Sequence, residues 1–181
     1  VNFGVFGTLD VSANAVAANM NLATDVATGV DAPRVAWATD VVRSAFNDFI
    51  TGDARANILS GGAGKDDVRG GAGHDKVHGG AGDDKVFGDD GDDYVDGGDG
   101  NDTLNGGPGS DALYGDGGND IIQVWGVEIP NLGFETLDGG TGFDTLQING
   151  LNPDIGAAQD FVDFTDLQDL IGFERLTFGE T

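Results

Sequence analysis

A nine-residue repeat, an excess of glycine and a fixed register between aspartate and aliphatic residues predict an all-β fold, a right-handed parallel β-roll (β-solenoid). From Gly61 the chain divides into seven consecutive nonapeptides that end at Gln123. In each of them the first and fourth residues are glycine, the sixth is aspartate and the eighth is aliphatic. Composition alone does not produce seven successive matches at one period, so we predict that the units stack as the layers of a solenoid.

A degenerate copy of the unit and an isolated copy flank this array. The central units are GGAGKDDVR, GGAGHDKVH, GGAGDDKVF, GDDGDDYVD, GGDGNDTLN, GGPGSDALY and GDGGNDIIQ. GDARANILS at 52–60 precedes them, and GGTGFDTLQ at 139–147 follows after an interruption. We therefore divide the chain into an N-terminal flank of degenerate β coils at 1–51, the roll at 52–123 and a C-terminal cap at 124–181. Trp37, Phe46 and Phe49 are expected to close the N-terminal end of the core.

Each unit is expected to fold as a tight loop followed by one short strand. Glycine supplies the positive-φ conformations that a loop of the first six residues needs, and it lets backbone carbonyl groups approach a common centre. Side chains alternate along the last three residues, so the eighth points inward while the seventh and ninth point to solvent. The inward residues are Val68, Val77, Val86, Val95, Leu104, Leu113 and Ile122.

Two units complete one coil of 18 residues, so the loops of alternate units stack along one edge of the roll and the remaining loops stack along the other. The loops that begin at 61, 79, 97 and 115 share one edge, and those that begin at 70, 88 and 106 share the other. These loops offer only oxygen ligands, aspartate carboxylates and backbone carbonyl groups, which are the ligands that calcium prefers. Several calcium ions are therefore expected between the stacked loops.

The sixth-position carboxylates are the predicted side-chain ligands. They are Asp66, Asp75, Asp84, Asp93, Asp102, Asp111 and Asp120, with Asp144 of the isolated unit as a further one. Asn57 holds this position in the degenerate first unit, where the missing charge predicts a weaker site or none. Carbonyl groups of loop positions one to four are expected to complete each shell: Gly61, Gly62, Ala63, Gly64, Gly70, Gly71, Ala72, Gly73, Gly79, Gly80, Ala81, Gly82, Gly88, Asp89, Asp90, Gly91, Gly97, Gly98, Asp99, Gly100, Gly106, Gly107, Pro108, Gly109, Gly115, Asp116, Gly117 and Gly118.

The pattern GGxGxDxUx, in which U is aliphatic, resembles the calcium-binding repeat of the RTX (repeat-in-toxin, hemolysin-type) proteins of bacterial type I secretion. The resemblance covers 52–123 and 139–147, just under half of the chain. It implies that each sixth-position aspartate serves two neighbouring ions. It also implies a secreted bacterial protein, extracellular or at the cell surface, whose chain is exported unfolded and folds on meeting extracellular calcium.

Charge predicts that the roll needs the metal. Residues 61–123 carry 15 aspartates against four basic residues, a net charge of −11, and only one aliphatic core residue per unit. Ordering a residue costs about 1–2 kcal/mol, whereas burying one aliphatic side chain returns about 1.5–3 kcal/mol. We therefore predict a stretch that is disordered without calcium and folded with it. Aspartates outside the sixth position are expected to be solvated charge that raises the local calcium concentration, namely Asp89, Asp90, Asp92, Asp96 and Asp99.

Composition also excludes several classes of function. A net charge of −24 argues against a nucleic-acid partner and against an anionic membrane surface. The absence of cysteine excludes disulfides and thiolate metal sites, and no apolar run reaches the roughly 20 residues of a membrane span. His74 and His78 are four residues apart, but they hold loop and strand positions, which argues against a shared zinc site. No nucleophile–histidine–acid set stands out, so the module is not expected to be an enzyme, although its parent protein can be one.

Two other functions stay open. A calcium-dependent polysaccharide- or surface-binding (adhesion) domain would use outward side chains or the aromatic residues of the flanks. An accessory module of a secreted enzyme would contact other domains of its parent, and a catalytic domain in that parent would identify it. The outward positions of the repeats are mixed, so the sequence shows no regular binding row.

Overall fold

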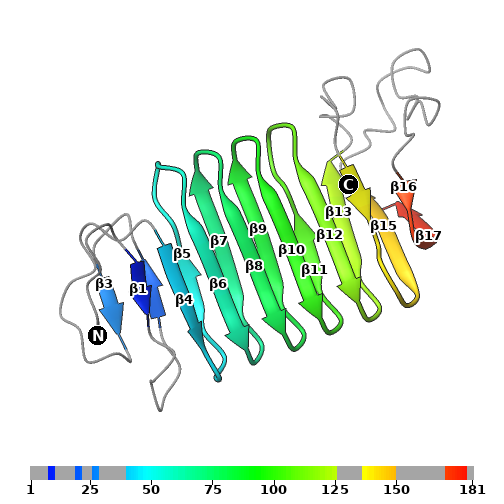
Figure 1. The fold of residues 1–181 in the computed structure, drawn as a ribbon. Coiled ribbons are helices and arrows are strands. Elements are labelled where there is room, and N and C mark those ends of the chain that lie inside the picture. Colours follow the sequence, from blue (N-terminus) through cyan, green and yellow to red (C-terminus); the bar gives the residue numbers. More distant parts are fainter. Residues whose placement is uncertain are drawn as a thin grey trace.

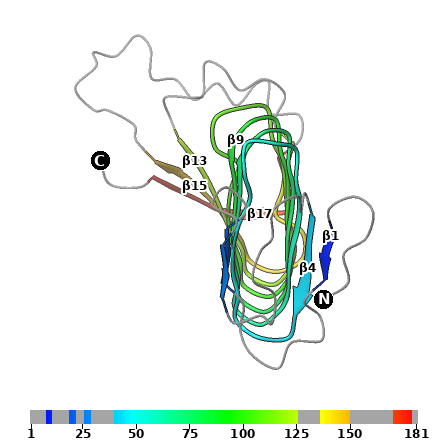
Figure 2. The ribbon, with the colours of Figure 1, turned by 90° about the vertical axis from the view of Figure 1, so that its left-hand side faces the viewer.

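The computed structural model describes residues 8–10, 19–21, 26–28, 40–125, 136–149 and 170–178, whose regular elements are all strands. The chain passes back and forth between two sheets that face each other, and successive coils stack along the axis of the roll (Figures 1 and 2). The expected all-β parallel β-roll is therefore confirmed. None of the described residues belongs to a helix that is long and apolar enough to cross a membrane.

Within the described residues sheet A has eight strands and sheet B has nine, and every neighbouring pair is parallel except β2 with β3. Sheet A runs in the order β1 (Thr8–Asp10), β4 (Asp40–Ser44), β6 (Ile58–Ala63), β8 (Lys76–Ala81), β10 (Tyr94–Asp99), β12 (Ala112–Gly117), β14 (Thr136–Asp138) and β16 (Leu170–Ile171). Sheet B runs in the order β17 (Phe173–Phe178), β15 (Asp144–Asn149), β13 (Ile121–Trp125), β11 (Thr103–Asn105), β9 (Lys85–Asp90), β7 (Asp67–Ala72), β5 (Phe49–Thr51), β2 (Asn19–Asn21) and β3 (Val26–Thr28).

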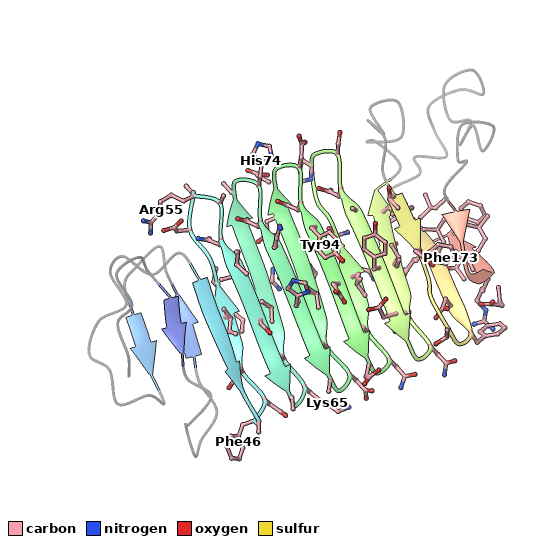
Figure 3. The ribbon with its side chains drawn as sticks, in the orientation of Figure 1. Phe46, Arg55, Lys65, His74, Tyr94 and Phe173 are labelled. Atoms are coloured by element: carbon pink, nitrogen blue, oxygen red, sulfur yellow. The ribbon has the colours of Figure 1, made fainter. Side chains whose placement is uncertain are left out.

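The register of the sheets confirms the coil of 18 residues. Val95 in β10 lies opposite Val77 in β8 and Leu113 in β12, so equivalent residues of alternate units meet. The loops alternate between the two edges as predicted: His74 and Lys65 belong to consecutive units and project from opposite edges in Figure 3. As a result, the sixth residues of consecutive units fall in two separate stacks, one at each edge of the roll.

The core is a single file of aliphatic side chains from each sheet. Each eighth-position residue is almost completely buried, and each is flanked by outward residues on its own strand. Sheet A contributes Leu59, Val77, Val95, Leu113 and Leu137, and sheet B contributes Ile50, Val68, Val86, Leu104, Ile122, Leu146 and Ile148. One narrow column per sheet is a small core for a chain of this charge.

The strands are longer than the sequence predicts. Most strands of the repeats have six residues, because pairing with the neighbouring coil continues past the ninth position into positions one to three of the next unit. Gly62 thus pairs with Gly80, and Ala63 with Ala81. The expected six-residue loop is therefore reduced to a short turn at positions four to six, and glycine in the first positions serves the sheet as well as the turn.

The ends of the roll differ from the repeats. Leu137 in β14 lies opposite Leu113, 24 residues away, so sheet A continues through the interruption of the period. In β13 and β15, Val124 and Ile148 stand where the repeats have their first glycine, and both strands leave the outline of the roll (Figure 2). The prediction that Phe46 and Phe49 close the N-terminal core is wrong: both are 41 % exposed, because Phe49 holds an outward seventh position and Phe46 lies in a turn. Trp37 lies outside the described residues.

Candidate calcium sites

The sixth-position aspartates are buried and form two hydrogen-bonded ladders. Each backbone N–H in a ladder donates to the carboxylate oxygen Oδ1 of the aspartate one coil ahead, as from Asp84 to Asp102 at 2.7 Å. One ladder follows sheet B and joins Asp66, Asp84, Asp102, Asp120 and Asp144. The other joins Asn57, Asp75, Asp93 and Asp111. The structure therefore brings together all eight predicted carboxylates, as two rows rather than one cluster.

The second carboxylate oxygen, Oδ2, is the feature that requires a cation. It is buried and accepts no hydrogen bond in Asp66, Asp75, Asp84, Asp93, Asp102, Asp120 and Asp144. In Asp111 it is buried in the same way. A buried carboxylate oxygen without a donor is strongly unfavourable, and no described basic side chain forms an ion pair with any of these groups. A row of such oxygens is what bound cations would stabilise.

Burial raises the pKa of these carboxyl groups. Loss of solvation raises the pKa of Asp66, Asp93 and Asp102 to about 6, and that of Asp84 and Asp120 to about 7, with neighbouring carboxylates adding to the effect. The same cause raises the pKa of Asp75 and Asp144. A neighbouring positive ion would reverse this trend, because it favours the charged form.

Glycine at the first position leaves room for a cation beside each carboxylate. A Cβ atom on Gly61 would lie 2.3 Å from Oδ2 of Asp66 and 2.7 Å from the carbonyl oxygen of Gly79, one coil ahead. Gly79 has the same two neighbours in Asp84 and Gly97, each at 2.6 Å. A carboxylate oxygen and a carbonyl oxygen thus border the same small space in successive coils. Any other side chain would fill that space.

The donor set fits calcium and not a transition metal. Within residues whose side chains the structure describes, no three His, Cys, Asp or Glu side chains gather around one point. The predicted sites would combine few carboxylates with backbone carbonyl oxygens, a hard and charge-poor set that suits calcium. His74 contacts Asp92 in a turn, whereas His78 pairs with Asp96 at 3.1 Å on the outer face of sheet A. The two histidines serve different surfaces, as their positions in the repeat indicate.

Five of the seven predicted carbonyl ligands of position three already accept one hydrogen bond each. They receive the N–H of a fourth-position glycine in the preceding coil, as from Gly82 to Asp99 at 2.7 Å. A carbonyl oxygen has two lone pairs, so one stays available to an ion. The same bond recurs from Gly64 to Ala81, Gly73 to Asp90, Gly91 to Pro108 and Gly100 to Gly117. The assignment of the loop oxygens as calcium ligands stays a prediction that this geometry fits.

Three positions depart from the consensus in informative ways. The side-chain oxygen of Asn57 accepts the N–H of Asp53 at 2.8 Å, and this hydrogen bond closes a turn within the loop of the first unit. Asp89 and Asp116 replace the second glycine and keep its positive φ, at 69° and 67°. That conformation disfavours side chains other than those of Asn and Asp, so aspartate is the natural substitute there.

Sequence reasoning missed two acidic residues that extend the sheet B ladder. Asp48 is buried, and its N–H donates to Asp66 Oδ1 at 2.7 Å, so it holds the sixth position of a further unit. Glu174 accepts the N–H of Asp144 at 2.8 Å and follows the last consensus unit. The unit of Asp48 lacks the consensus glycines and that of Glu174 keeps only Gly172, but each acid is followed two residues later by an aliphatic residue, Ile50 and Leu176. A search for an acidic residue followed two positions later by an aliphatic one would have identified both acids.

A comparison with protein families agrees with this geometry. The model of the RTX calcium-binding nonapeptide repeat matches four times, at 44–77, 69–104, 87–122 and 131–147. No curated protein matches the chain. The matched segments together make up more than half of the residues and contain both aspartate ladders. The chain therefore belongs to the family of proteins with RTX calcium-binding nonapeptide repeats, and calcium binding follows from that membership.

Proposed function

We propose that this chain is a calcium-driven folding module of a secreted bacterial protein, exported unfolded by type I secretion and folded by extracellular calcium. The observation that carries the proposal is the row of buried Oδ2 oxygens without hydrogen-bond donors. In the metal-free roll these carboxylates repel one another and lack solvent, so the folded state is unfavourable. Bound calcium supplies the missing positive charge, and its binding energy becomes folding energy.

The switch needs calcium sites of moderate affinity. Extracellular calcium modules work at about 10⁻⁴–10⁻³ M, far above the levels at which cytosolic calcium proteins bind. Sites in that range stay empty before export and fill outside the cell. Few carboxylates per site favour such an affinity, because affinity rises with ligand charge. In this proposal the module itself is not catalytic, and any enzymatic activity belongs to other domains of the parent protein.

Far-ultraviolet circular dichroism during a calcium titration tests the proposal, with magnesium as the control. We expect a coil spectrum in chelator and a cooperative change to β structure with a midpoint near 10⁻⁴–10⁻³ M calcium. Magnesium should not produce it, because magnesium requires a strict octahedral shell and releases its water reluctantly. A chain that is folded in chelator, or one that folds at about micromolar calcium, would contradict the secretion-linked mechanism.

A calcium-dependent polysaccharide-binding surface is the second candidate, and one observation favours it. On the outer face of sheet A the ring of Tyr94 packs 5.2 Å from that of Tyr114 and 5.7 Å from that of His78, which makes an aromatic row across three strands. Tyr94 is 36 % exposed and faces the viewer in Figure 3. The net charge favours neutral sugars over anionic ones. Retention on neutral polysaccharide in calcium, and its loss in Tyr94→Ala, would support this function.

A further inference from the structure

The last turn of the roll is much shorter than the others. Between β14 and β15 the chain makes a turn of ordinary length from Gly139 to Phe143. Between β16 and β17 the corresponding turn is the single residue Gly172, with φ at +76°. Because β16 pairs with β14 and β17 with β15, this corner stacks directly on the loop of the last consensus unit. Residues 172–174 lie beyond the segments that the family model matches.

Glu174 takes the place of a sixth-position aspartate at this corner. Its oxygen Oε2 accepts the N–H of Asp144 at 2.8 Å, the bond that Asp144 itself makes to Asp120 one coil earlier. The ladder shifts its register between Asp144 and Thr145, as a shortened turn requires. Glutamate has one more methylene group than aspartate, so its carboxylate reaches the ladder from a corner that lacks the full loop.

The corner also reproduces the carbonyl oxygen that borders the first glycine of the regular loops. A Cβ atom on Gly139 would lie 2.6 Å from the carbonyl oxygen of Gly172, as one on Gly115 would lie 2.4 Å from that of Gly139. Oδ2 of Asp144 is buried and accepts no hydrogen bond. Gly172 thus stands where the next consensus unit would place its first glycine.

No described basic group neutralises this corner. Asp138 adds a third carboxylate nearby, with its Oδ1 bound to the N–H of Gly140 at 3.0 Å. The only described cation in reach is Arg175, whose guanidinium lies over the ring of Phe143, 5.2 Å from its centroid. Phe173, labelled in Figure 3, packs partly buried against the core behind the corner. The corner therefore combines a buried carboxylate oxygen without a hydrogen-bond donor and an additional acid, and no described basic side chain forms an ion pair with either.

We propose a further calcium site, between the loop 139–144 and the corner 172–174, which takes Asp144, the Gly172 carbonyl group and the Glu174 carboxylate as ligands. The proposal rests on the proposed function, because it requires that the consensus loops bind calcium. It goes beyond that function in assigning a ligand outside the nonapeptides. This site fastens the final strand pair, β16 and β17, to the roll through an ion, since hydrogen bonds alone join only eight residues there.

The test compares Glu174→Gln with Asp92→Asn in the full chain. Each variant loses one negative charge and keeps an oxygen for a neighbouring coil, since Asp92 Oδ1 accepts the N–H of Ser110 at 3.0 Å. Native mass spectrometry at limiting calcium counts bound ions, and hydrogen exchange at saturating calcium reports on each segment. We expect Glu174→Gln to bind one ion fewer, with faster exchange confined to 170–178. Asp92→Asn should match the wild-type chain in both measurements.

The outcomes separate this site from the function on which it rests. An unchanged ion count in Glu174→Gln, with wild-type protection of 170–178, would show that hydrogen bonds alone hold the corner and would overturn the proposal. If Asp92→Asn lost the same ion and the same protection of 170–178, the proposal would also be overturned, because the loss of any one negative charge would then explain the effect. A wild-type chain that gains no protection at 61–123 from calcium would instead refute the proposed function itself.

Discussion

Replacing Asp102 by asparagine should have opposite effects on the metal-free and the calcium-loaded roll. Asparagine retains an oxygen for the N–H of Asp84, so the ladder hydrogen bond survives. Its amide nitrogen takes the place of Oδ2 beside the carbonyl oxygen of Gly115, which is an acceptor. The variant therefore removes the charge without removing the shape. Without calcium it should stabilise the fold, and with calcium it should weaken it.

The magnitude follows from the pKa of Asp102. Loss of solvation raises this pKa from 3.8 to about 6, which corresponds to about 3 kcal/mol. A carboxyl group whose pKa is higher in the folded chain costs stability once it ionises. That cost is absent below pH 3.8, grows as the pH rises toward 6 and is complete above it. At about pH 7.5 the asparagine variant escapes the cost. The loss of a direct charged ligand should weaken calcium binding by at least the roughly 10- to 100-fold that loss of an outer-shell partner causes.

Circular dichroism measures both effects. In chelator, the wild-type chain should gain β structure as the pH falls from about 7.5 to about 5, where Asp102 and its neighbours of similar pKa become protonated. This range stays above the isoelectric point of 4.1 and so avoids precipitation. Asp102→Asn should begin that transition at a higher pH, yet need more calcium to fold at pH 7.5. If the variant lowers β structure in chelator as well as in calcium, the reasoning about buried charge is wrong.

Three further perturbations test the core, the turns and the weak first site. Leu104→Ala should lower the free energy of unfolding in saturating calcium by about 2–5 kcal/mol, measured with urea, because Leu104 is fully buried in a single-file core; a loss below 1 kcal/mol would show that the column collapses around the gap. Gly91→Ala should prevent folding at any calcium concentration, since its Cβ would lie 1.5 Å from the carbonyl oxygen of Gly73, and a normal dichroism spectrum would contradict this. Asn57→Asp should add a carboxylate to the first loop and lower the calcium midpoint, and an unchanged midpoint would indicate that this loop holds no ion.

The sequence predicted the repeats well because each of their positions has one physical task. The aliphatic residue at position eight must face inward, and Val77, Val95 and Leu113 do so in consecutive coils of sheet A. The aspartate at position six must lie beside its counterpart 18 residues away once the period is fixed. The 18-residue coil therefore predicts that Asp84 and Asp102 are neighbours, whereas the hydrogen bond between them is seen only in the structure.

The ends were harder to predict because there the coil continues without the full consensus. Leu137 continues the core 24 residues after Leu113 and nine before Leu146, but its unit has glutamate at position six and no glycine at position one, so the consensus passes over it. Around Asp48 the chain has Arg43 and Phe46 where the consensus has glycine, which hides a unit whose buried residues are normal. At Glu174 a one-residue turn and a longer acid replace the loop. Around Leu137 and Ile50 packing kept the inward residue buried while the loop changed, whereas Leu176 after Glu174 is 43 % exposed.

The aspartate ladder gives the roll two different ends. Each sixth-position N–H donates toward the C-terminus, so a coil offers its carboxylate to the coil before it and depends on the carboxylate of the coil after it. If the roll is cut, the C-terminal piece begins with a carboxylate oxygen that water solvates well. The N-terminal piece ends with a backbone N–H that has lost its charged acceptor. We therefore expect deletions to be tolerated better when they remove the first coils than when they remove the last.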